Sequence, residues 1–144
     1  MICPLLMGQL SINGTIRPSI MYNISDQEQM YLPFRIAQLR MGNTIGSFDF
    51  LVNSALEHRW GGKQDPTFQV REAYLAWFPS WGEVKLGKQI HAWGVADGNN
   101  PTDNLNPYDY YYMFFQGADR KIGSLSAAVI TYWENWQLEG VIIP

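Results

Sequence analysis

The chain has few charged residues, one cysteine and no long apolar run. Cys3 alone excludes an internal disulfide and a zinc site built on paired cysteines. Because no stretch approaches the ~20 apolar residues of a spanning helix, a helical membrane protein is also excluded. The ten Lys and Arg residues are dispersed and the net charge is −3, which argues against nucleic acid as a partner.

Catalytic motifs are absent as well. The sequence contains no GxSxG, P-loop, HExxH or CxxC motif, and His58 and His91 lie on separate expected strands. We therefore expect no enzymatic activity, no cofactor and no metal site. An outer-membrane lipid enzyme with a Ser-His pair stays open as an alternative.

What the sequence does contain is alternation. From Leu10 to Ile24, apolar residues with Gly14 and Pro18 occupy one parity and polar residues the other, apart from Met21. This pattern predicts a strand with one apolar and one polar face. Fifteen residues would span about 50 Å at ~3.3 Å each, which is long for a soluble sheet but suits a membrane barrel.

The aromatic content of 15% fits the aromatic girdles of such a barrel. It also fits a soluble carbohydrate-binding β-sandwich that exposes Trp and Tyr to sugar rings. The two architectures differ in what they predict for the apolar parity. Its side chains would face lipid and be exposed in the barrel, but would be buried in the sandwich; they include Ile12, Ile16, Ile20, Phe48, Phe50 and Val52.

The remaining sequence predicts a meander. We expect strands over Met30–Met41, Phe48–Arg59, Thr67–Phe78, Glu83–Trp93 and Lys121–Tyr132, and a seventh from Gln137. Polar connections at 25–29, 42–47, 60–66, 79–82 and 134–135, and a long loop at 94–117, separate them. The fold class is therefore all-β: an antiparallel meander forming part of a transmembrane β-barrel, with about six or seven strands.

Seven strands are too few to close a bacterial barrel, for which eight is the usual minimum. We therefore expect residues 1–144 to be a single partial domain from the N-terminal portion of a barrel; a complete small soluble barrel or sandwich is the alternative. Residues 1–8 are either the tail of a signal peptide or a short apolar N-terminus.

Two positions disturb the alternation. Lys88 falls on the apolar parity, so either Gly87 marks a bulge or the lysine reaches an interface. The phase of the alternation is undecided at Arg71 and Glu72, so that one or the other would face the polar side.

Four motifs carry a family resemblance: Arg71–Leu75 (REAYL), Gly87–Gln89 (GKQ), Trp93–Gly98 (WGxADG) and Thr102–Asp109 (TDxxNPxD). In this order they resemble an uncharacterised porin-like outer-membrane β-barrel family of Gram-negative bacteria. Glu139–Pro144 resembles the WIP-like segment of that family loosely, with Gly140 where an apolar residue is expected. The resemblance implies an outer-membrane location and a longer barrel, without implying a substrate.

Within the long loop, the candidate residues are Trp93, Asp97, Asp103, Asn104 and Asp109. Their Asp and Asn side chains would cap nearby backbone amides. Alternatively, the loop folds toward the lumen and narrows the pore. Calcium binding is a third alternative, although the spacing lacks the EF-hand pattern.

The polar parity predicts a lumen of mixed charge. Its candidate lining residues are Arg17, Arg40, Asp49, Glu57, Arg59, Glu83 and Lys85. They would either line a pore for solutes or pair across strands as structural ion pairs. The aromatic run from Tyr108 to Phe115 is expected to form an interfacial belt, with sugar stacking as the alternative.

Taken together, the sequence predicts an outer-membrane porin-like channel for small polar solutes. Its expected partners are outer-membrane lipid and an unidentified solute, and a homo-oligomer such as a trimer would be ordinary for a porin. The soluble carbohydrate-binding β-sandwich is the alternative function.

Overall fold

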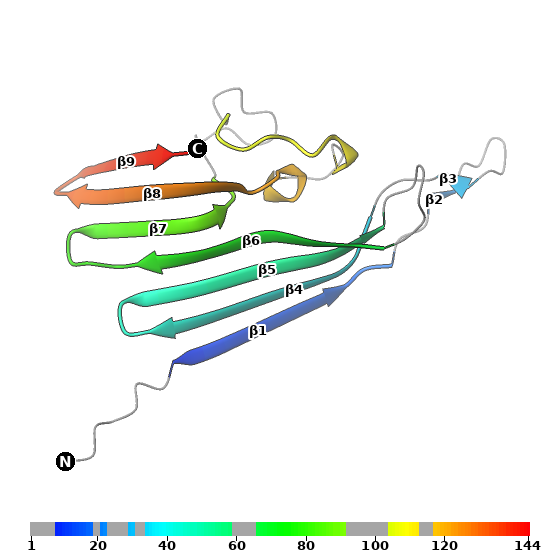
Figure 1. Cartoon of the computed structure of the whole chain (residues 1–144), viewed down its shortest axis with the longest axis horizontal. Coiled ribbons are helices and arrows are strands. Elements are labelled where there is room, and N and C mark those ends of the chain that lie inside the picture. The colour runs from blue at the N-terminus through cyan, green and yellow to red at the C-terminus, as the bar shows by residue number, and fades with distance from the viewer. Residues whose placement is uncertain are drawn as a thin grey trace, which may run out of the picture.

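The computed structural model describes residues 8–18, 21–22, 29–30, 34–58, 66–91, 104–112 and 117–144. Seven strands form one antiparallel sheet in the order β1-β4-β5-β6-β7-β8-β9, so neighbours in the sheet follow chain order (Figure 1). Their bounds are β1 Gln9–Ile16, β4 Phe34–Ile45, β5 Phe48–His58, β6 Thr67–Trp77, β7 Gly82–Gln89, β8 Ser124–Trp133 and β9 Trp136–Ile142. The predicted all-β meander of about seven strands is confirmed.

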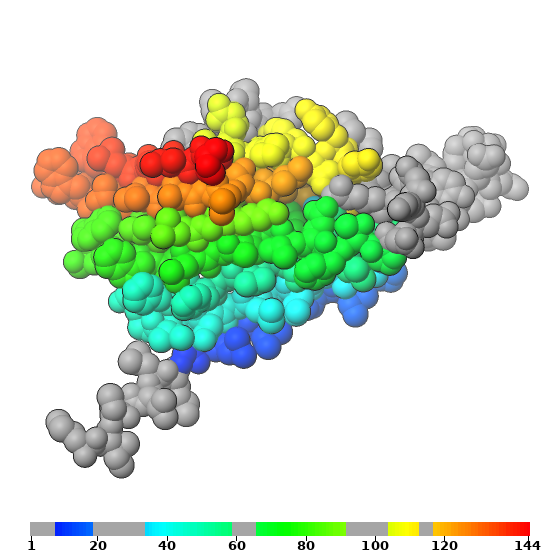
Figure 2. Space-filling model, viewed as in Figure 1, coloured from blue at the N-terminus to red at the C-terminus, as the bar shows by residue number. Residues whose placement is uncertain are grey.

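Smaller elements occupy the connections. β2 (Met21–Tyr22) and β3 (Gln29–Met30) form a separate two-stranded sheet and belong to the chain segment that connects β1 to β4. The 3-10 helices η1 (Tyr110–Tyr112) and η2 (Gly117–Arg120) lie between β7 and β8. The main sheet is not closed, because β1 and β9 each pair with one neighbour; Figure 2 shows the strands as successive bands from blue at one edge to red at the other.

Short and long connections alternate along the chain. Residues 46–47, 78–81 and 134–135 link strands at one end of the sheet, which we call the short-turn end. The strand ends that the longer connections join lie at the opposite, long-loop end (Figure 1): Ile16 and Phe34, His58 and Thr67, and Gln89 and Ser124. Gly46 has a φ of 60°, which glycine adopts without penalty in a two-residue hairpin turn.

Several strand bounds differ from the prediction. β1 stops at Ile16 instead of Ile24: its last bond to β4 is Arg17 N–H to Ile36 O, and Pro18 has no N–H to continue the ladder. β4 runs on to Ile45 through predicted turn residues, because Gly42 to Thr44 pair with both β1 and β5. β7 ends at Gln89 rather than Trp93, and β8 begins at Ser124 rather than Lys121.

The register divides the sheet into two faces, because residues opposite each other on neighbouring strands share a face. We call the face of Ser11, Asn13 and their register partners the polar face. One polar row runs through Asn13, Arg40, Asn53 and Glu72. On the apolar face, a single row crosses all seven strands and contains Leu10, Asn43, Phe50, Leu75, Leu86, Ala127 and Ile142.

Candidate functional site on the polar face

Burial in this sheet is the reverse of that in a soluble domain. Of the described residues, only four apolar ones are buried: Ala55, Ala76, Tyr112 and Ala128. Twelve polar or charged ones are buried: Arg35, Asn53, Ser54, Glu57, Arg71, Glu83, Gln89, His91, Asn106, Asp109, Lys121 and Ser126. Since buried charges require partners, the polar face must be organised by side-chain hydrogen bonds.

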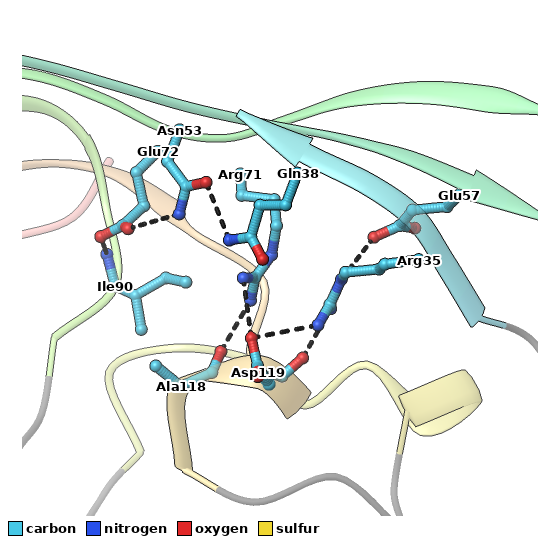
Figure 3. Close-up of polar contacts among 9 residues, drawn as sticks. All are labelled: Arg35, Gln38, Asn53, Glu57, Arg71, Glu72, Ile90, Ala118 and Asp119. Atoms are coloured by element: carbon cyan, nitrogen blue, oxygen red, sulfur yellow. Dashed lines mark hydrogen bonds and ion pairs between the residues drawn. The ribbon is translucent and has the colours of Figure 1, made fainter. Parts of the chain in front are cut away.

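The centre of this organisation is an ion-pair cluster of Arg35, Glu57, Arg71 and Asp119 (Figure 3). Arg35 Nε lies 2.9 Å from Glu57 Oε1, and the Glu57 side chain is only 1% exposed. Asp119 Oδ1 receives both arginines, at 3.2 Å from Arg35 Nη1 and 3.1 Å from Arg71 Nη1. The cluster therefore ties β4, β5 and β6 to η2, which lies over the polar face.

Backbone carbonyls and an aromatic ring complete the cluster. Arg35 Nη2 donates to Asp119 O at 2.6 Å, and Arg71 Nη2 donates to Ala118 O at 2.8 Å. The guanidinium carbon of Arg35 lies 4.1 Å from the ring centroid of Tyr112, which is fully buried. Charge-assisted bonds and a cation–π contact thus hold η1 and η2 against the sheet.

Two bulges bring the arginines into this position. The register shifts between Arg35 and Ala37, leaving Ile36 without a partner on β5, and again at Arg71, which has no partner between the pairs Asn53–Glu72 and Ser54–Val70. A bulge places consecutive residues on the same side of a strand. Arg71 and Glu72 therefore both point to the polar face, which answers the open question of phase (Figure 3).

Side chains replace the backbone ladder where β6 and β7 separate. These strands pair only from Ala73–Lys88 to Trp77–Val84, so the N-terminal half of β6 has no partner on β7. Lys88 Nζ donates to Val70 O at 2.7 Å, and Ile90 N donates to Glu72 Oε1 at 3.4 Å. The hydrogen bond to Val70 O accounts for the presence of Lys88 on the apolar parity. The register is continuous through Gly87, so a bulge there is excluded.

A hydrogen-bonded chain extends from this gap across the face. Glu72 Oε2 accepts from Asn53 Nδ2 at 3.2 Å, and Asn53 Oδ1 accepts from Gln38 Nε2 at 2.9 Å (Figure 3). The chain links β4, β5, β6 and the end of β7.

Asn106, the asparagine of the NPxD motif, closes the ends of β7 and β8. It is 2% exposed; its Oδ1 accepts from His91 N at 2.6 Å, and its Nδ2 donates to Gln89 O, Ile122 O and Ser124 Oγ at 3.0–3.2 Å. In the same motif Asp109 N donates to Arg120 O at 2.7 Å. These contacts give the motif a structural role.

His91, which donates its backbone N–H to Asn106, also contacts Ser126 and Lys121. His91 Nε2 is 2.9 Å from Ser126 Oγ, and Lys121 Nζ donates to His91 O at 3.2 Å. Burial lowers the pKa of the His91 imidazole, and the cations Lys85 and Lys121 lower it further, against an opposing effect of Glu139. Burial also lowers the pKa of the Lys121 amine.

The predicted lining residues divide between two roles. Glu57 is a structural ion-pair partner directly opposite Arg35, which fits the alternative of cross-strand pairing. Arg40, Asp49, Glu83 and Lys85 line a hollow of about 350 Å³ on the polar face, where Lys85 Nζ lies 2.7 Å from Glu83 Oε1. Arg17 is exposed beyond the end of β1. Arg59 lies outside the described residues.

The loop candidates are only partly described. Asp109 is buried and its Oδ1 accepts from Tyr111 N at 3.1 Å, so its predicted capping role is confirmed. Asn104 is exposed. Trp93, Asp97 and Asp103 lie outside the described residues, and so does Ile20 of the predicted apolar parity.

The predicted aromatic belt from Tyr108 to Phe115 is wrong for Tyr112, which is buried beneath Arg35 rather than at a surface. Tyr108 packs with Arg120, whose guanidinium carbon is 5.1 Å from the ring centroid. Tyr110 and Tyr111 are exposed, and residues 113–116 lie outside the described ranges. Tyr112 departs from the predicted belt because η1 folds back onto the sheet.

Local sequence patterns do not indicate the roles of several important residues. Arg35 and Asp119 are not among the predicted site residues, and the contacts that Tyr112 and Asn106 make are not predicted, because the partners come from distant segments. The nearest signal was the NPxD motif itself, since an asparagine before a proline in a long loop often stabilises a turn.

No group of three or more His, Cys, Asp and Glu side chains in the described ranges is placed to hold a metal ion. Among the same residues, no helix is long and apolar enough to cross a membrane. No protein-family model, curated protein or solved structure matches this chain. The resemblance to a porin-like family therefore stays a prediction.

Proposed function

We propose that this chain forms part of an outer-membrane β-barrel channel in which small polar solutes diffuse along the polar face. The observation that carries the proposal is the reversed burial: charged residues are enclosed on one face, while large apolar side chains are exposed on the other. Ile12 is 59% exposed, Ile16 77%, and Phe48, Phe50 and Val52 between 37% and 48%. A lipid-facing surface accounts for such exposure across seven strands.

Strand length supports the same assignment. β4, β5, β6 and β8 have 12, 11, 11 and 10 residues, against the ~9–11 residues that a tilted transmembrane strand needs. β1, β7 and β9 are shorter, at 8, 8 and 7 residues.

Aromatic residues at the short-turn end add to this support. The rings of Phe48 and Trp77 stack at 6.3 Å, and Trp77 meets Trp81 edge-on at 6.1 Å. Trp133 and Trp136 lie opposite each other beside the last turn and are 71% and 68% exposed. Exposed tryptophans at one end of an apolar face are typical of a membrane–water interface.

The loop segments 104–112 and 117–121 suggest how passage would be restricted. The ion-pair cluster holds the second of them over the polar face, and Asp119 stays 41% exposed. In a closed barrel this segment would narrow the lumen, with charges of both signs along it.

The test expresses the protein with a signal peptide and asks for three results: membrane-fraction protein, heat-modifiable gel migration and conductance in planar bilayers. Soluble folded protein without conductance would overturn the proposal and favour the carbohydrate-binding sandwich.

A matched pair of variants tests whether the apolar face contacts lipid or water. Ile12 and Asn13 are adjacent and exposed near the middle of β1, on opposite faces. In a membrane, Ile12→Arg should lower the free energy of unfolding by about 2–4 kcal/mol, whereas Asn13→Arg should change it little. Equal tolerance of both arginines would contradict a lipid-facing surface.

A further inference from the structure

The polar face contains two adjoining hollows that share Tyr74 and Lys85. The hollow of about 350 Å³ extends from these residues toward Asn13, Arg40 and Asp49. The second, of about 300 Å³, extends toward β9 and ends at Glu139. Both are within the size range of small-molecule sites. None of the contacts that fix η1 and η2 to the sheet uses Tyr74 or Lys85, so the structural role of the face leaves this region unexplained.

Charge in the larger hollow is balanced. Arg40 and Lys85 contribute two positive charges, and Asp49 and Glu83 contribute two negative charges. Lys85 is already paired with Glu83 at 2.7 Å. A balanced set of this kind gives an ion of either sign little net attraction, but it offers donors and acceptors to a neutral polar molecule.

Tyr74 is the aromatic residue common to both hollows, and its neighbours leave it room. Its register partner on β7 is Gly87, and the next residue of β6 on the same face is Ala76. The Lys85 amine lies 6.0 Å from the Tyr74 ring centroid, near the limit of a cation–π contact. An aromatic surface bordered by carboxylates, an arginine and amides can stack on the C–H face of a sugar ring while its neighbours bond the hydroxyls.

We infer that Tyr74, with Arg40, Asp49, Glu83 and Lys85 around it, forms a binding subsite for a neutral polyhydroxylated solute of mono- or disaccharide size. The inference rests on the proposed function for its setting, a water-filled lumen, and it specifies the class of solute that this lumen favours. Tyr74 supplies the stacking surface, and the charged side chains supply hydrogen bonds that fix the orientation of the solute.

Calorimetric titration of the detergent-folded full chain with sucrose tests the subsite. We expect saturable binding that Tyr74→Ala weakens by about tenfold or more, the scale of one lost stacking contact, and that Tyr74→Phe retains. Tyr110→Ala, which removes an exposed tyrosine outside both hollows, should bind sucrose as the natural chain does. If Tyr74→Ala fails to fold, Asp49→Asn replaces it, with weaker sucrose binding expected.

Sodium glutamate and arginine hydrochloride serve as charged probes. Absence of sucrose binding, sucrose binding unaffected by Tyr74→Ala, or tighter binding of either charged probe would each overturn the subsite. Sucrose binding and conductance test the subsite and the channel separately. Conductance without sucrose binding disproves the subsite alone, whereas Tyr74-dependent sucrose binding without conductance keeps the subsite and disproves the channel.

Discussion

The two ends of the sheet are stabilised in different ways. At the short-turn end, tight hairpins join strands whose backbone ladders are continuous, and aromatic side chains pack on the apolar face. At the long-loop end, bulges interrupt β4 and β6, and ion pairs and side-chain hydrogen bonds take over from the ladder. The first end is built from local preferences, and the second depends on contacts between segments distant in sequence.

Removal of the ion-pair cluster is expected to destabilise the long-loop end most. Arg35→Ala leaves the Glu57 carboxylate buried without its 2.9 Å partner. We expect it to lower the free energy of unfolding by about 3–5 kcal/mol, the usual cost of breaking a buried pair. Guanidinium titration of detergent-folded protein, followed by tryptophan fluorescence, measures the change.

Arg40→Ala is the matched control, because Arg40 lies on the same strand and face but is exposed. It should change the free energy of unfolding by no more than about 0.5 kcal/mol. Equal losses in the two variants would mean that the cluster does not stabilise the long-loop end.

The next largest effect concerns Asn106. Asn106→Ala removes the acceptor of His91 N and the donor to two carbonyls, leaving buried groups unsatisfied. The expected loss is about 2–3 kcal/mol by the same titration. Asn104→Ala, two residues earlier and exposed, should be nearly neutral. A neutral Asn106→Ala would remove the structural explanation of the motif.

The short-turn end could be predicted from the sequence better than the long-loop end, because its contacts are local. At the short-turn end, alternation and turn residues located β5 and β6 to within one residue and the turn at 134–135 correctly. Turn signals at Gly42 to Thr44 were misleading, because pairing with strands on both sides outweighs local preference.

At the long-loop end, the same patterns could not locate the site. The bulges at Ile36 and Arg71 change which side chains share a face, and a bulge is defined only against its partner strand. Asp119 lies 84 residues after Arg35, so nothing local in the sequence indicates their pairing. The polar parity did identify Glu57 at this end, and Glu83 and Lys85 elsewhere in the sheet, as residues of the polar face.

A smaller, stabilising effect is expected at the short-turn end. Glu134 has a φ of 52°, a conformation that costs a non-glycine residue about 1 kcal/mol or more. Glu134→Gly should therefore raise the free energy of unfolding by up to about 1 kcal/mol. The gain is reduced because glycine also increases the conformational entropy of the unfolded chain. Glu134→Ala retains the Cβ atom and should give no such gain; an equal gain would show that the charge, not the backbone, is responsible.

The smallest effect is expected in the pH dependence of the free energy of unfolding. Burial lowers the pKa of His91 below its ordinary 6.5, so the unfolded chain binds a proton more readily than the folded one. The contribution of His91 to stability is therefore complete above pH 6.5 and is lost as the pH falls below that value. His91→Gln keeps a polar partner for Ser126 Oγ but has no proton to gain. Its unfolding free energy should fall less than that of the natural chain between pH 7 and pH 5, whereas His58→Gln, which retains His91, should keep the natural difference. Identical pH dependence in the natural chain and His91→Gln would mean that the long-loop end admits a charged imidazole, contrary to the burial that distinguishes it from the short-turn end.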